Sequence, residues 1–167
     1  MRLPASQFAF GVSLFMSTIV SATPQIPHTR NMSPILGPTS IPVPLTPLTL
    51  ILTLWPAKPL RKDDILTSVA LASSAADAAG VLNPVGRKGF RTTVGDLLLR
   101  VPVFARSYTW GQLNATMETV KDYMVDKGQW AVATWEVEDM AISRKVAEGH
   151  LVSQSQFVDG EARLPWT

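Results

Sequence analysis

The sequence predicts a single compact α+β domain over about residues 47–153, in the order β-α-β-α-β-β. We expect two helices to pack on one face of a mainly antiparallel sheet. Three observations predict this class. Leucines alternate with other residues over 48–55, two longer segments carry apolar residues every three or four positions, and two further apolar segments end the domain.

The first strand and helix are expected next to each other. Leucine occupies positions 48, 50, 52 and 54, a period of two that gives a strand one apolar face, and Pro56 ends it. The first helix is expected over about residues 62–79. Asp63 lies in its first turn, where a negative charge complements the helix dipole, and Gly80 stops it.

The second half of the domain begins with a loop over 81–93 and a strand over 97–103. Thr109 is predicted to cap a helix of about 18 residues, because its hydroxyl can accept a hydrogen bond from a free amide of the first turn. Gly128 is predicted to end this helix. Its apolar stripe consists of Trp110, Leu113, Met117, Val120 and Met124.

Residues 129–138 and 142–152 are predicted to form an antiparallel hairpin. The expected register opposes Glu136 to Arg144 and Trp130 to His150, which pairs unlike charges. The face predicted to point inward carries Ala131, Ala133, Trp135, Val137, Ala147 and Leu151, with Lys145 as its one charge. The face predicted to point outward carries Trp130, Val132, Glu136, Arg144, Val146, Glu148 and His150.

The two ends of the chain are expected to lie outside this domain. Residues 1–22 are interpreted as a secretory signal peptide, because Arg2 precedes an apolar run over 8–20 that gives way to small residues ending at Ala22. We therefore expect a secreted, extracellular protein with no integral membrane segment in the mature chain. Residues 23–46 are predicted to be a disordered, proline-rich arm, and 154–167 an irregular tail.

Composition excludes several classes of function. The chain has no cysteine, which excludes thiol nucleophiles, disulfides and zinc knuckles. It has two histidines, and its formal net charge of +2 gives no electrostatic footprint for nucleic acid. No cofactor, no metal site and no nucleic-acid partner is expected.

The segment 107–151 contains Ser-Tyr-Thr-Trp-Gly-Gln-Leu at 107–113, Trp-Glu-Val-Glu-Asp at 135–139 and Glu-Gly-His-Leu at 148–151. It resembles small secreted proteins of filamentous fungi, a loose group with no assigned function. The resemblance implies a fungal origin and the order helix then hairpin. It implies no catalytic residue.

Three hypotheses for function are open. The first is a non-enzymatic binding or interaction module with an extracellular protein or glycan as partner, favoured because no catalytic motif occurs. The alternative is a small hydrolase that acts on an extracellular polymer through carboxylates near the hairpin. These two hypotheses differ in the pocket that they require. If Glu136, Glu148 and His150 lie in one pocket with shifted pKa values, the binding hypothesis is no longer favoured over the hydrolase. The third hypothesis is a structural component of a cell wall or extracellular matrix.

Several residues are candidates for modification or contact. Trp130, Arg144, Glu148 and His150 are the binding candidates. If Trp130 and its apolar neighbours are exposed, the hairpin face could also form a homodimer. Asn31 and Asn114 begin sequons and are glycosylation candidates in a secreted chain.

Overall fold

The computed structural model describes residues 36–158 and 161–162. The predicted signal peptide, residues 23–35 of the predicted arm, the sequon at Asn31 and the last residues of the tail lie outside the described residues. None of these predictions is tested by the fold.

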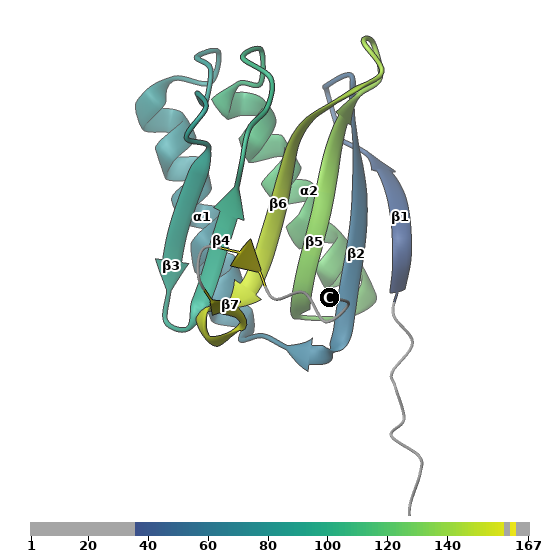
Figure 1. Ribbon diagram of the computed structural model, residues 1–167, viewed down its shortest axis with the longest axis vertical. Coiled ribbons are helices and arrows are strands. Elements are labelled where there is room, and N and C mark those ends of the chain that lie inside the picture. Colours follow the sequence, from purple (N-terminus) through teal and green to yellow (C-terminus); the bar gives the residue numbers. More distant parts are fainter. Residues whose placement is uncertain (1–35, 159–160, 163–167) are drawn as a thin grey trace, which may run out of the picture. The chain divides into compact units, whose positions relative to one another are not determined.

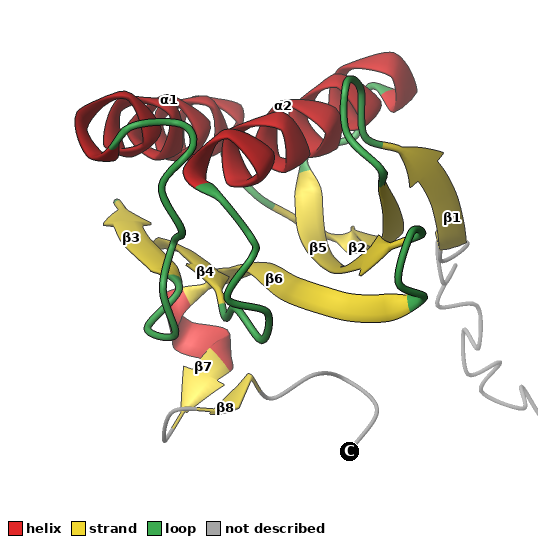
Figure 2. Cartoon of the chain, turned by 90° about the horizontal axis from the view of Figure 1, so that it is seen from above, coloured by secondary structure: helices red, strands yellow, loops and turns green. Residues whose placement is uncertain are grey.

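Six strands form one sheet in the order β1-β2-β5-β6-β4-β3, and every neighbouring pair is antiparallel. The two helices lie side by side on one face of this sheet (Figures 1 and 2). The elements of the sheet and its helices are β1 (Leu36–Pro42), β2 (Leu48–Pro59), α1 (Lys62–Ala79), β3 (Phe90–Val94), β4 (Leu97–Val101), α2 (Trp110–Lys127), β5 (Ala131–Asp139) and β6 (Arg144–Ser153). A 3-10 turn, η1 (Gln154–Gln156), and the pair β7 (Phe157–Val158) and β8 (Glu161–Ala162) follow.

The predicted α+β class is confirmed, with two helices on one face of an antiparallel sheet. Since β4 and β5 both pair antiparallel with β6, they run parallel to each other, and α2 connects them. This connection is a split βαβ unit with β6 inserted between its strands. It brings the C-terminal hairpin to the middle of the sheet.

The sheet is wider than predicted, because each edge carries a strand that the sequence pattern did not show. β1 lies in the stretch assigned to the disordered arm, and β3 lies in the predicted loop. Proline is tolerated at an edge, where an amide would face solvent rather than a partner. Pro38 and Pro42 therefore fit β1, which pairs with β2 on one side and has an irregular register between Leu36 and Thr39.

The main core lies between the helices and the sheet. β2 contributes its four alternating leucines, all buried, as the period of two predicts. The expected stripe of α2 is buried from Leu113 to Met124, while Trp110 is half-buried. Thr109 caps α2 as predicted: its hydroxyl accepts a hydrogen bond from the Gln112 amide at 3.3 Å, and the Gln112 side chain accepts one from the Thr109 amide at 2.9 Å.

The hairpin register differs from the predicted one by four residues. Glu136 pairs with Glu148 rather than with Arg144, and His150 pairs with Thr134 rather than with Trp130. A shift by an even number keeps each side chain on its face. The predicted inward residues of both strands are accordingly buried. Lys145 is the exception, because the bulge after Val137 turns it to the side of the glutamates.

The apolar surface expected on the outer face of the hairpin is not exposed. Val132 and Val146 are each only 2% exposed. Trp130 is half-buried, packs against the main core and lies under the Lys62 ammonium, whose Nζ is 5.2 Å from the ring centroid. The two valines are therefore not available as the exposed apolar surface that the sequence predicted, and the homodimer itself stays a prediction.

Gly149 of β6 faces the core opposite Trp135, and the indole lies directly across it. A Cβ atom at Gly149 would overlap the indole ring. This close approach explains a glycine in the middle of a central strand.

We predict that Gly149→Ala lowers the free energy of unfolding by about 1 to 3 kcal/mol, because the added methyl group displaces Trp135 from its packed position. Denaturant unfolding measures the change. Gly37→Ala is the matched control, since Gly37 is exposed and a Cβ there meets nothing within 4 Å. Equal stability of the two variants would contradict this account.

Candidate functional site

The face of the sheet away from the helices carries a polar region at its centre. Strand pairing places Thr53, Thr134, His150 and Arg100 in one row across β2, β5, β6 and β4. The adjacent row holds Ile51, Glu136 and Glu148. Because alternate residues of a strand share a face, the buried leucines of β2 dictate that its intervening residues line this surface.

A hollow of about 510 Å³ lies over these two rows. We call it the sheet pocket. It is lined by Pro38, Ile51, Thr53, Thr134, Trp135, Glu136, Glu148 and His150. Three of its residues, Glu136, Glu148 and His150, are those that the sequence analysis grouped near the hairpin.

One lysine holds the two glutamates together. The Lys145 Nζ lies 2.9 Å from a Glu136 carboxylate oxygen and 2.7 Å from a Glu148 oxygen. Like charges that face each other directly across two strands destabilise a sheet, so the ammonium offsets a repulsion that the register creates. Partial burial lowers the pKa of Lys145, but the two carboxylates outweigh it and raise the pKa above its ordinary value.

The Glu148 carboxyl is held in its ionised form. Partial burial raises its pKa, but the hydrogen bond and the charge of Lys145 outweigh this effect, and His150 adds to it. The net result is a pKa below the ordinary value. At neutral pH, Glu148 is therefore a hydrogen-bond acceptor and not a proton donor.

His150 is neutral at neutral pH. Burial lowers its pKa, the Glu148 carboxylate 3.7 Å from its Nε2 opposes the shift, and the charges of Arg100 and Lys145 lower the pKa further. Its side chain is 18% exposed, and among the described residues the buried Nδ1 has no hydrogen-bond partner. A neutral imidazole can donate one hydrogen bond and accept another.

The other binding candidates lie away from the sheet pocket. Arg144 is exposed at the turn of the hairpin, opposite Asp139. Trp130 lines a separate hollow with Pro56, Pro59 and Gln129. Asn114 is half-buried, and its side-chain oxygen accepts a hydrogen bond from Ser73 of α1 at 2.7 Å. Its glycosylation stays a prediction.

The β1 and β2 lining of the sheet pocket was missed by the sequence analysis. Ile51 and Thr53 occupy the odd positions between the leucines, and this alternation was the available signal for their shared face. Pro38 had no such signal, because its segment was interpreted as an arm.

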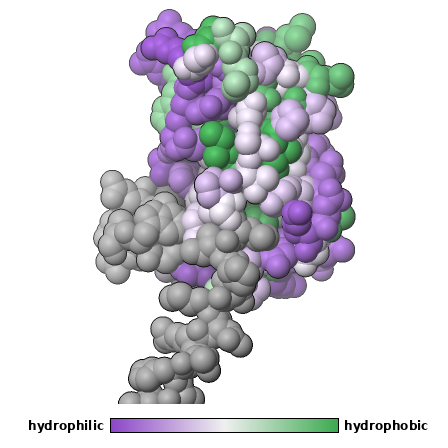
Figure 3. Space-filling view, turned by 90° about the vertical axis from the view of Figure 1, so that its right-hand side faces the viewer, coloured by the Kyte–Doolittle hydropathy of each residue, from purple (hydrophilic) through white to green (hydrophobic). Residues whose placement is uncertain are grey.

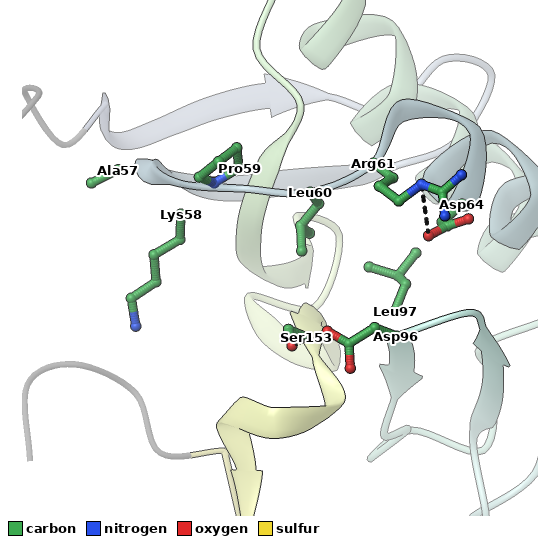
Figure 4. Close-up of a pocket in the computed structure, with 9 residues that line it drawn as sticks. All are labelled: Ala57, Lys58, Pro59, Leu60, Arg61, Asp64, Asp96, Leu97 and Ser153. Atoms are coloured by element: carbon green, nitrogen blue, oxygen red, sulfur yellow. Dashed lines mark hydrogen bonds and ion pairs between the residues drawn. The ribbon is translucent and has the colours of Figure 1, made fainter.

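A second pocket, of about 420 Å³, lies where β2 leads into α1 and includes Asp96 and Ser153 (Figure 4). Arg61 forms an ion pair with Asp64 at 3.9 Å, and the Ser153 hydroxyl donates a hydrogen bond to Asp96. No histidine lines this pocket, so its serine lacks the base that usually activates a hydroxyl nucleophile.

No family model, curated protein or solved structure is significantly similar to this chain. Over residues 36–158 and 161–162, neither helix combines the length and apolar character needed to cross a bilayer. The same part of the chain contains no cluster of three or more histidine, cysteine or acidic residues that could hold a metal ion.

We predict that Lys145→Met raises the pKa of the Glu148 carboxyl, because the variant removes the ammonium that stabilises its charged form. Stability at neutral pH is expected to fall by about 1 kcal/mol as the two opposed carboxylates lose their bridge. Carboxyl titration by NMR measures the pKa. Lys127→Met, at the exposed end of α2, is the control, and an unchanged Glu148 pKa in Lys145→Met would contradict the bridge.

We predict that acid weakens the fold through His150. Its folded-state pKa lies below the ordinary 6.5, so the unfolded chain binds the proton first as the pH falls. The free energy of unfolding should therefore decrease from about pH 6.5 downward. His150→Gln should flatten this slope in denaturant unfolding between pH 7 and pH 5. His28→Gln, which changes the only other histidine, should retain it, and an unaltered slope in His150→Gln would refute the assignment.

Proposed function

We propose that this protein is a secreted binding module, and that the sheet pocket takes a neutral, hydroxyl-rich ligand, as a glycan is. The observation that carries this proposal is the set of polar groups in the pocket. Glu136 and Glu148 supply carboxylate acceptors, and His150 supplies a neutral imidazole. Sugars present pairs of hydroxyl groups that can donate to such acceptors.

The remaining lining suits the same class of ligand. Thr53 and Thr134 add hydroxyls that can donate or accept, while Ile51 and Pro38 add apolar area against which the carbon face of a sugar ring can lie. Lys145 offsets part of the charge of the two glutamates, so the site does not select strongly for a cation. Secretion is proposed from the N-terminal sequence and agrees with an extracellular glycan.

The hydrolase is the second candidate, and one observation favours it. The sheet pocket gathers Glu136, Glu148 and His150, and the pKa values of two of them are shifted. Titratable groups with shifted pKa values that gather in one pocket are typical of a catalytic site. The lack of a catalytic motif is therefore no longer enough to favour the binding module. His150 could act as a general base, with Glu148 beside it.

The direction of the pKa shifts supports the binding module over the hydrolase. A glycosidase of the usual kind needs one carboxylic acid that is kept protonated by a raised pKa. The pKa of Glu148 is lowered, and Lys145 lies between the two carboxylates, where a glycosidase would place the sugar or a water molecule. These features favour binding over bond cleavage.

The test is titration with soluble oligosaccharides, namely cello-, chito- and β-1,3-gluco-hexaose, followed by amide chemical shifts. We expect one of them to shift the amides of β2, β5 and β6. Glu136→Gln and His150→Ala should each weaken its binding by about tenfold or more, because the first removes a charged acceptor and the second removes the hydrogen bonds of the imidazole. Glu118→Gln, on α2, is the matched control and should bind normally.

Two outcomes would overturn the proposal. Binding of none of the three sugars would remove the glycan as the ligand. Sustained release of new reducing ends, lost in Glu136→Gln and His150→Ala but retained in Glu118→Gln, would establish the hydrolase in place of the binding module.

A further inference from the structure

Exposed apolar side chains gather at one end of the molecule, apart from the sheet pocket. We call this the loop end, and it consists of loops 43–47, 80–89, 102–109 and 140–143. The described residues include eight large hydrophobic side chains that are exposed. Leu71 and Val125 belong to the helices, and the other six belong to these loops: Leu45, Val81, Leu82, Phe104, Met140 and Ile142.

Backbone hydrogen bonds tie each of the four loops to a neighbouring loop or element at this end. The Met140 amide donates to the Pro47 carbonyl, which places the β5–β6 turn beside the β1–β2 turn. The Phe104 amide donates to Val146 at the start of β6, and the Gly111 amide at the start of α2 donates to Val81. Figure 1 shows these loops together at the top of the fold, and hydrophobic side chains reach the surface at the top of Figure 3.

The apolar side chains protrude from the tips of the loops. Leu45 is fully exposed, Leu82 is 87% exposed and Met140 is 61% exposed. Leu45 also holds a left-handed backbone, with φ of 62°, in the turn between two strands. A leucine in that conformation is strained, and strain of this kind concentrates at sites that contact other molecules. Apolar side chains that gather at one end of a molecule are typical of a surface that contacts another molecule or a membrane.

The charge of the loop end has one sign. The four loops contain Arg87, Lys88 and Arg106, all exposed, and they contain no acidic residue. Next to the β5–β6 turn, Arg144 lies opposite Asp139 in the strand pairing, so these two charges balance each other. The nearby Asp139 accepts a hydrogen bond from the amide of Ala141 within its own turn. The loop end therefore complements a negatively charged surface.

We propose that the loop end docks on an anionic lipid membrane. Separate aliphatic tips on a protruding set of loops can enter the boundary between headgroups and acyl chains, while the arginines and the lysine remain at the level of the phosphates. This inference goes beyond the proposed function, because it uses other residues. The sheet pocket lies on the open face of the sheet, so docking leaves it accessible to a ligand.

The test is flotation of the full chain with phosphatidylcholine vesicles and with vesicles that contain 30% phosphatidylglycerol. We expect binding to the anionic vesicles, much weaker binding to the neutral ones, and loss of binding at high salt. The double variant Leu82→Ser with Met140→Ser should bind about tenfold or more weakly, because two apolar tips no longer enter the lipid. Arg87→Glu with Lys88→Glu should bind the anionic vesicles more weakly by a similar factor.

Control variants carry comparable substitutions elsewhere in the chain. Leu71→Ser with Val125→Ser removes two exposed apolar side chains from the helices, and Lys127→Glu reverses a charge on α2. Both should bind as the unaltered chain does. Since all variants share one N-terminal sequence, differences between them report the loop end alone. Equal binding by the loop-end variants and the control variants would overturn the proposal. So would a chain that does not bind vesicles but forms a dimer, measured by sedimentation equilibrium, that the loop-end variants abolish.

Discussion

The packing of the Trp135 indole across Gly149 holds β5 and β6 in one register, and the candidate site depends on that register. With these two residues paired, Glu136 must face Glu148 and Thr134 must face His150 on the other side of the sheet. A slip by one residue would exchange the buried and open faces of the hairpin. The chemistry of the open face is thus a consequence of a contact made inside the core.

Elements with a strong internal pattern could be predicted from the sequence. The leucines of β2 and the apolar stripe of α2 repeat over several strand periods or helical turns, so the periodicity of apolar residues alone identifies these elements. The two edge strands have no such pattern. β1 contains prolines and β3 is mostly polar, and each exists because a neighbouring strand supplies its partners. Pairing of this kind is tertiary, and local preference does not contain it.

The candidate site was predictable in part for the same reason. Glu136, Glu148 and His150 share a face by parity, which the sequence shows directly. Lys145 could not be placed, because the bulge after Val137 reverses its side, and a bulge depends on the local geometry of the turn. The expected pairing of Glu136 with Arg144 rested on unlike charges, whereas the protein opposes two like charges and bridges them with a third.

The prolines of β1 have a consequence for how far the sheet can grow. A strand at the rim of a sheet presents free amides and carbonyls to any other extended chain, and this is how sheets recruit one another into aggregates. Pro38 and Pro42 carry no amide hydrogen, so the outer border of β1 lacks donors at two of its seven positions. A second extended chain would therefore find fewer amide donors along the outer border of β1, and addition of a further strand there is disfavoured.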